Sequence, residues 1–260
     1  MNRLFRTLFI FLVLLTTRGA VAQPVQAKIS VVNSNGYSVT QAARSEVDEL
    51  NELEDFQRYL PLQNSRDLDE LMQQTEAAQS ELTSLINLVS AQTQTQAIIA
   101  QPKSRIRAEQ KIATKFAGET AKITDLARAS IVASDVSSLM SAYKQLEQHA
   151  EIVQLKNRFA NPKASGYRDL NALVKLPNSQ MIVEVQLHLN DIAEIKSGAE
   201  HDTYVQVQAI EANAKRQQRQ LNDIETAQIT KLRQASHKLY HKAWLGYKRQ
   251  NMAAHTLTAA

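Results

Sequence analysis

Apolar residues at helical spacing mark the first third of the chain, after a polar stretch from Gln23 to about Arg44. From Glu46 an apolar residue recurs every three or four positions, which predicts a helix. A longer helix should follow from about Asp67, whose side chain suits a helix N-cap. Residues 91–102, rich in Gln, Thr and Ala, predict a break after it. The apolar positions are Leu50, Leu53, Phe56 and Leu60 in the first helix, and Leu68, Leu71, Ala78, Leu82, Leu85 and Val89 in the second.

The middle of the chain alternates short apolar runs with one amphipathic segment. We expect, in order, strand 129–133, helix 136–148, strand 151–155, strand 170–176 and strand 181–189. The last two strands should form a hairpin around Pro177. From about residue 191 to 249 the chain is highly charged, and its apolar residues keep helical spacing. This order indicates an α+β fold in which a small mixed sheet is flanked by N- and C-terminal helices.

The first 22 residues have the three parts of an export signal. Arg3 and Arg6 form a basic start, residues 8–15 are apolar, and Ala20–Ala22 gives a small-x-small cleavage pattern. The apolar run is too short to span a bilayer as a helix, although an uncleaved amphipathic anchor is an alternative. We expect cleavage after Ala22 and a mature protein in the periplasm or the medium. No later segment is apolar enough to be transmembrane, so we expect no stable membrane insertion.

This organisation divides the chain into a signal peptide (1–22), a linker (23–45), one domain (46–250) and a tail (251–260). The formal net charge is +4, and loss of the three arginines of the signal reduces it to +1. The overall charge therefore does not indicate a nucleic-acid or membrane partner. The chain has no cysteine, which excludes disulfides and thiolate metal sites. About 240 mature residues suffice for one sizeable core.

Charged residues gather before the strand expected at 129–133. Five cations come first; they are Lys103, Arg105, Arg107, Lys111 and Lys115. The last three repeat every four residues, so on a helix they share one cationic face, and a solvated face is the simpler interpretation. Asp125 and Arg128 follow, and taken alone they form no more than a local ion pair.

A basic loop containing a glycine lies between two of the predicted strands. It runs from Asn161 to Asp169, follows Lys156, and contains Lys163, Tyr167 and Arg168. Such a loop suits a phosphate-rich ligand, and the tyrosine ring offers a surface on which a base can stack. The alternative is an ordinary basic turn.

Polar residues alternate with apolar ones on the strand at 181–189. Because side chains alternate across a strand, Glu184, Gln186 and His188 share the face opposite Val183 and Val185. A carboxylate that points into a cleft from a strand can bind magnesium or act as a base. The alternative is a half-buried strand with a polar outer face, which is the commonest kind.

The order of these clusters is more specific than any one of them. Asp-x-x-Arg before a strand, a Pro-Lys-x-x-Gly-Tyr loop and Glu-Val-Gln on a later strand resemble the synthetase domain of the RelA/SpoT family. That family makes the alarmone nucleotides (p)ppGpp. The resemblance runs from about Lys103 to Gln208 and is most specific from Lys156 to Gln186. It implies a nucleotidyltransferase-like fold.

The resemblance also implies roles for individual residues. Asp125 and Glu184 would bind Mg²⁺, and Glu184 could accept the proton of the attacking hydroxyl. The implied acceptor-nucleotide site comprises Lys163, Tyr167, Arg168 and Gln186, with the tyrosine ring stacked on the base. The implied phosphate and ATP site comprises Arg105, Arg107, Lys111, Arg128 and Lys156.

Two departures from the family pattern leave the acceptor open. Ser165 stands where the family usually has Asn, and the histidine expected after the tyrosine is replaced by Asn171. The implied reaction is transfer of pyrophosphate from ATP to the 3′-hydroxyl of a GTP- or GDP-like nucleotide, with an exported toxin or effector as one setting. The alternatives are pyrophosphorylation of a tRNA 3′ end, and a non-catalytic nucleotide- or RNA-binding module.

Overall fold

The computed structural model describes residues 45–258, except for the side chains of residues 199 and 255–258. The predicted signal peptide, its cleavage site and almost all of the predicted linker lie outside these residues. Within the described part, no helix has the length and apolar character needed to cross a membrane.

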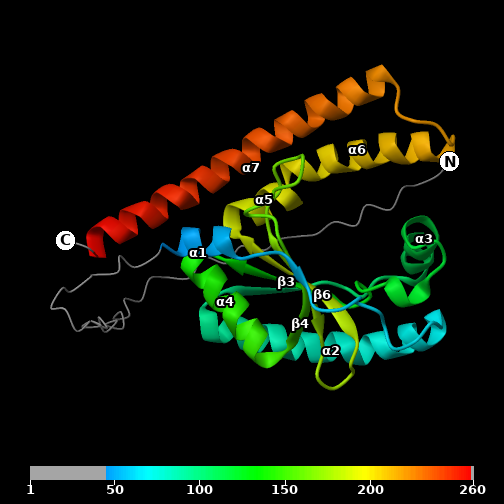
Figure 1. The fold of residues 1–260 in the computed structure, drawn as a ribbon, viewed down its shortest axis with the longest axis horizontal. Coiled ribbons are helices and arrows are strands. Elements are labelled where there is room, and N and C mark those ends of the chain that lie inside the picture. The colour runs from blue at the N-terminus through cyan, green and yellow to red at the C-terminus, as the bar shows by residue number, and fades with distance from the viewer. Residues whose placement is uncertain (1–44, 259–260) are drawn as a thin grey trace, which may run out of the picture. The chain divides into compact units, whose positions relative to one another are not determined.

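A six-stranded sheet lies at the centre of the described chain (Figure 1), with the strand order β1-β4-β5-β6-β3-β2. The strands are β1 (Phe56–Gln57), β2 (Gln96–Ile99), β3 (Arg128–Ala133), β4 (Glu151–Asn157), β5 (Leu170–Lys175) and β6 (Ile182–Leu189). β3 and β6 run parallel, with Arg128 opposite Glu184, and the other neighbouring pairs are antiparallel. The sheet is therefore mixed, as the sequence predicts.

Helices flank this sheet on both faces. They are α1 (Glu46–Glu52), α2 (Leu68–Thr93), α3 (Arg105–Lys115), α4 (Val136–His149), α5 (Asn190–Ser197), α6 (Ala199–Arg216) and α7 (Asp223–Thr258). α2 and α4 contact each other and cover one face of the sheet, while α5 contacts β3 and β6 from the other side (Figure 1). α6 leads away from α5, and α7 returns beside both. This arrangement confirms the predicted α+β class.

The two faces of the sheet differ in polarity because side chains alternate along each strand. Ile131, Ala172 and Val185 are fully buried in the core that α2 and α4 complete. The opposite face carries polar side chains, among them Glu184 on β6 and Asn171 on β5, which hydrogen bond to each other. The candidate site is built on this polar face.

Short-range signals place the helices that support the sheet. Asp135 caps α4, because its Oδ1 accepts a hydrogen bond of 2.7 Å from the backbone N–H of Ser138. Asp67 accepts a hydrogen bond from the N–H of Asp69 at the start of α2, which confirms the predicted cap. The carboxylate of Glu81 on α2 also accepts bonds from two N–H groups in the turn of the β5–β6 hairpin.

The prediction of a first helix extending to Leu60 is wrong. α1 ends at Glu52, and four residues later Phe56 pairs with Leu155 in the short contact between β1 and β4. Apolar spacing alone cannot separate these outcomes, because Phe56 packs against the same core either way. Pro61 also disfavours helix at the residue before it.

Two other expected boundaries are wrong. The predicted break at 91–102 contains β2, which pairs with β3 after Gln94 ends α2 in the left-handed conformation with φ 54°. The expected tail from residue 251 continues α7 to Thr258. Asn251 hydrogen bonds there to Ser45 and Glu46, so the end of α7 holds the start of α1.

Candidate functional site

Asp125 is a buried carboxylate between two lysines, just before β3. Its Oδ2 lies 3.0 Å from Lys103 Nζ and 2.8 Å from Lys111 Nζ. Burial alone would raise the pKa of Asp125, but hydrogen bonds and charge from Lys111 and Lys103 outweigh burial and hold the pKa below its usual value. Asp125 is therefore an anion held by lysines, and its expected local ion pair with Arg128 is not found among the described residues.

The second oxygen of Asp125 makes the site suitable for a cation. Oδ1 is buried and has no hydrogen-bond partner in the described part of the protein. Buried polar atoms are normally satisfied, so an open carboxylate oxygen fits a metal ligand position. No group of three or more His, Asp or Glu side chains gathers in a metal-binding arrangement within residues 45–258. A metal here would therefore be bound by one or two carboxylates together with oxygen atoms of a bound substrate.

Glu184 lies at the same end of the sheet as Asp125. It pairs with Arg128 in the parallel ladder, and its backbone N–H bonds to the carbonyl oxygen of Ala127, two residues after Asp125. Its side chain is half-buried on the polar face, where Oε1 accepts a hydrogen bond of 2.8 Å from Asn171 Nδ2. The topology thus brings the two acidic residues to one end of β3 and β6, and a shared metal remains a prediction.

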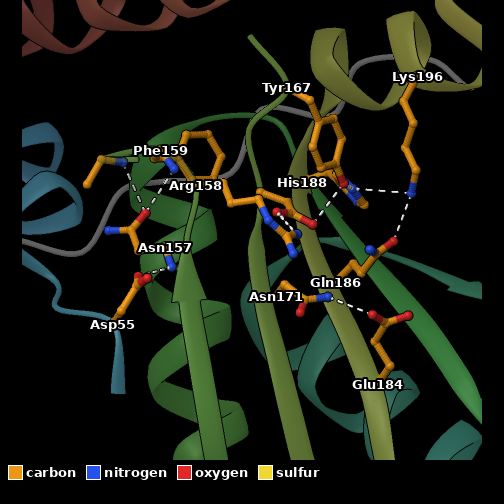
Figure 2. Close-up of polar contacts among 12 residues, drawn as sticks. Asp55, Asn157, Arg158, Phe159, Tyr167, Asn171, Glu184, Gln186, His188 and Lys196 are labelled. Atoms are coloured by element: carbon orange, nitrogen blue, oxygen red, sulfur yellow. Dashed lines mark hydrogen bonds and ion pairs between the residues drawn. The ribbon is translucent and has the colours of Figure 1, made fainter. Parts of the chain in front are cut away.

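A chain of buried hydrogen bonds crosses the polar face beside Glu184 (Figure 2). Arg158 Nη1 lies 2.7 Å from Asp169 Oδ1, and the Tyr167 hydroxyl donates to Asp169 Oδ2 at 2.8 Å. The same hydroxyl lies 2.7 Å from His188 Nε2. Lys196 of α5 reaches this chain from above, with Nζ 2.8 Å from Gln186 Oε1 and 3.4 Å from His188 Nε2.

Proton positions in this chain follow from the charges at its ends. Burial raises the pKa of Asp169 above its usual value, although the adjoining guanidinium of Arg158 partly opposes this. Burial raises the pKa of Tyr167 well above its usual value and lowers the pKa of His188 well below its own, so both are neutral. The single phenolic proton of Tyr167 goes to Asp169, so His188 must donate from Nε2 to the phenolic oxygen.

The prediction that Tyr167 offers an open ring for base stacking is not met. Tyr167 is only 7% exposed, and its ring packs edge-on against Tyr240 of α7 at 5.6 Å between centroids. The backbone of α7 comes close to the loop because Gly166, at φ +79°, has no Cβ: one there would lie 2.9 Å from the Cα of His237. The C-terminal helix, which the local motif does not contain, covers this ring.

Arg168 and Arg105 serve other contacts than those predicted. The guanidinium of Arg168 donates to the carbonyl oxygen of Phe159 and lies 5.6 Å from the ring centroid of Trp244, so it ties the loop to α7. Arg105 pairs with Asp69 and Glu109 on the exposed surface.

The remaining predicted residues divide between the polar face and solvent. Gln186 lies on the polar face and accepts the bond from Lys196, and the backbone of Arg128 is held on both sides by Gln79 of α2. Arg107, Lys156 and Lys163 are exposed.

Sequence reasoning left several site residues without a role. Lys103 belonged to the first cationic cluster but received no function, although it is buried against Asp125. Asp169 and His188 receive no separate role from their motifs, and nothing in the sequence singles out Lys196. The alternation that singled out His188 was a usable signal, whereas Lys196 reaches the sheet only through the placement of α5.

Comparison with protein families and curated proteins finds similarity in this region. Residues 100–209 match a family model described as "Region found in RelA / SpoT proteins". The curated protein "GTP pyrophosphokinase YwaC" of Bacillus subtilis (strain 168) is 27% identical over 122 residues, which cover 41% of this chain and 58% of the relative. The chain therefore spans less than two thirds of that relative's length.

Solved structures with similar folds agree with the family match. A chain in the crystal structure of the complex between the Type VI effector Tas1 and its immunity protein superposes with a TM-score of 0.50 at 19% identity, covering 66% of this chain and 94% of that one. A GTP pyrophosphokinase family protein from Streptococcus pneumoniae gives 0.50 at 15% identity, covering 72% and 96%. At these identities the likeness concerns the fold alone, and it agrees with the match of residues 100–209 to the model of a region found in RelA / SpoT proteins.

Proposed function

We propose that the domain is a Mg²⁺-dependent pyrophosphokinase that transfers pyrophosphate from ATP to the 3′-hydroxyl of an acceptor nucleotide. One observation carries the proposal: Asp125, its two lysines and Glu184 lie at one end of the β3–β6 pair, inside the region matched to RelA/SpoT proteins. The match to a GTP pyrophosphokinase supports the reaction class and a GTP- or GDP-like acceptor.

Lys103, Lys111 and Asp125 form the donor side of the proposed site. The lysines now neutralise Asp125, and both can turn to the phosphates of ATP once another cation takes their place. Asp125 Oδ1 and Glu184 are the oxygens that would hold Mg²⁺, which when bound would offset negative charge on the phosphates. The site therefore suits chemistry that depends on positioning and charge neutralisation.

The proposed reaction forms one bond and breaks one. The acceptor's 3′ oxygen bonds to the β-phosphorus of ATP, the bond from that phosphorus to the oxygen bridging to the α-phosphate breaks, and AMP leaves. The hydroxyl proton passes to Glu184, whose hydrogen bond from Asn171 orients the carboxylate on the polar face. Lys103 and Lys111 offset the charge that develops on AMP.

A second candidate function is nucleotide binding without turnover. It is favoured by Tyr167, which is buried under α7 and therefore cannot stack on a base in the conformation described. A catalytic protein must open this contact or place the base elsewhere. A binding module has no such requirement, and it would show Mg²⁺-dependent nucleotide affinity with no release of AMP.

Turnover by the purified protein separates the two candidates. The protein is incubated with ATP, Mg²⁺ and a panel of GTP, GDP, ATP and deacylated tRNA, and AMP is measured. We expect AMP release that needs both Mg²⁺ and one acceptor class, and we expect Glu184→Gln to abolish it. Magnesium-dependent binding without AMP would support the binding module, and neither binding nor turnover would contradict both candidates.

We further propose that the protein acts outside the cytoplasm, on the pattern of its first 22 residues. The fold likeness to a Type VI effector is compatible with an exported effector. N-terminal sequencing of the exported protein should begin at Gln23, and an intact Met1 in the exported pool would contradict the proposal.

A further inference from the structure

Lys196 is a cation on the polar face with no carboxylate to match it. Its side chain descends from α5 to the neutral side chains of Gln186 and His188 (Figure 2). Among the described residues, no Asp or Glu oxygen lies within 4 Å of its ammonium group. Two other cations of the same region do have carboxylate partners: Lys103 binds Asp125 and Arg158 binds Asp169.

The hydrogen bonds of Lys196 are also incomplete. Because His188 donates from Nε2 to the Tyr167 oxygen, that nitrogen cannot accept a proton from Lys196, and the distance of 3.4 Å is long for a bond. Gln186 Oε1, at 2.8 Å, is then the well-placed acceptor for an ammonium group that has three N–H donors. Two of those donors are left for water or a ligand.

Keeping an unpaired ammonium at this depth is unfavourable. Removing a charge from water without a counter-ion costs free energy, and burial lowers the pKa of Lys196, although Asp169 and Glu184 partly offset this. Lys163 adds a second cation: the ammonium groups of Lys163 and Lys196 lie 5.3 Å and 6.0 Å from the centroid of the Tyr167 ring. Two cations this close together lower the stability of the protein without a ligand, and they favour the binding of an anion.

We propose that Lys196 binds a phosphate group of the acceptor nucleotide. The inference rests on the proposed function, which supplies a nucleotide on this face of the sheet, and it adds a ligand-binding residue from α5. Lysine fits this role because its ammonium is a point charge with donors only, which suits phosphate oxygens. The same residue then costs the free protein stability and contributes affinity for phosphorylated acceptors.

Lys196→Met tests this, because methionine keeps the unbranched stem and removes the charge. The matched control is Lys231→Met, at an exposed lysine of α7. Binding of GDP and ADP, each compared with its nucleoside, is measured by calorimetry without a donor. For whichever diphosphate binds wild type, we expect Lys196→Met to reduce the binding affinity by about ten- to a hundred-fold, as for a lost hydrogen bond to a charged group. The affinity for the corresponding nucleoside should stay within about twofold of the wild-type value.

Thermal melting separates ligand binding from a structural role. We expect the melting temperature of Lys196→Met to equal or exceed that of wild type, because an unpaired ammonium is removed. A lower melting temperature with unchanged diphosphate affinity, or an equal loss for diphosphate and nucleoside, would overturn the inference.

If wild type binds no nucleotide, the proposed function fails, and inorganic tripolyphosphate becomes the probe for Lys196. An affinity lower in Lys196→Met than in Lys231→Met would then still support an anion site at Lys196. Equal affinities would overturn it.

Discussion

Replacing Asp125 by asparagine should both inactivate and destabilise the protein. The side chains of Asp125 and Lys103 are only 11% and 10% exposed, and their charges lie 3.0 Å apart. The neutral amide of an asparagine at this position could not offset the charge of that buried ammonium. Removing one member of a buried pair costs about 3–5 kcal/mol, and we take the lower end because Lys111 is more exposed and can turn to water. For a domain of this size, about 3 kcal/mol corresponds to a fall in melting temperature on the order of 6–12 °C.

Glu184→Gln is the matched control for Asp125→Asn. Its amide oxygen can still accept the bond from Asn171, and the side chain is only half-buried, so the free energy of unfolding should change by about 1 kcal/mol or less. Both variants should lose turnover, while only Asp125→Asn should melt early. Scanning calorimetry of the three proteins without Mg²⁺ makes the comparison. A melting temperature for Asp125→Asn within about 2 °C of wild type would refute the reasoning that the lysines depend on Asp125.

Three further changes test how α7 and α4 are held. Tyr167→Ala should lower the free energy of unfolding by about 3–5 kcal/mol, and not only weaken acceptor binding, because it leaves a cavity where the buried ring packs against Tyr240. Chemical denaturation measures this, and a loss of less than about 1 kcal/mol in the free energy of unfolding would contradict the buried position of the ring. Gly166→Ala should also lower the melting temperature and raise proteolysis of α7, because a Cβ would lie 2.9 Å from the Cα of His237; unchanged melting and digestion would show that the contact adjusts freely. Asp135→Ala should cost about 1 kcal/mol at pH 7 through loss of the α4 cap. Burial opposes ionisation of Asp135, but hydrogen bonds from Ser138 hold its folded pKa below the usual value. The loss of stability caused by Asp135→Ala should therefore persist above about pH 4 and vanish as the pH falls through the folded pKa. A loss that stays constant from about pH 7 to about pH 2 would contradict a lowered pKa for Asp135 in the folded protein.

Much of the fold follows from local patterns in the sequence. The strand at 129–133, helix α4 and the β5–β6 hairpin were predictable because each has its own periodicity and its own turn or cap. β1 and β2 were not, since two to four residues carry too little pattern and each exists only through its partner strand. Phe56 shows the difficulty: the same apolar residue satisfies a helix pattern and a strand pairing.

The parts of the candidate site that depend only on the order of the motifs along the chain could be predicted from the sequence. Asp125 and Glu184 reach the same end of the sheet because β3 and β6 are parallel, and the motif order anticipates this. The environment of each residue was not predictable. Lys103 next to Asp125, Lys196 above Gln186 and Tyr240 over Tyr167 come from other points in the sequence.

The fate of labelled phosphates tests the central claim most directly. The protein is incubated with Mg²⁺, the acceptor panel and ATP labelled either at the α- or at the γ-phosphate, and the products are separated. Pyrophosphate transfer predicts that the γ label enters the acceptor while the α label leaves in AMP, and that Glu184→Gln stops both. An α label in the acceptor, or a γ label only in inorganic phosphate, would contradict the account.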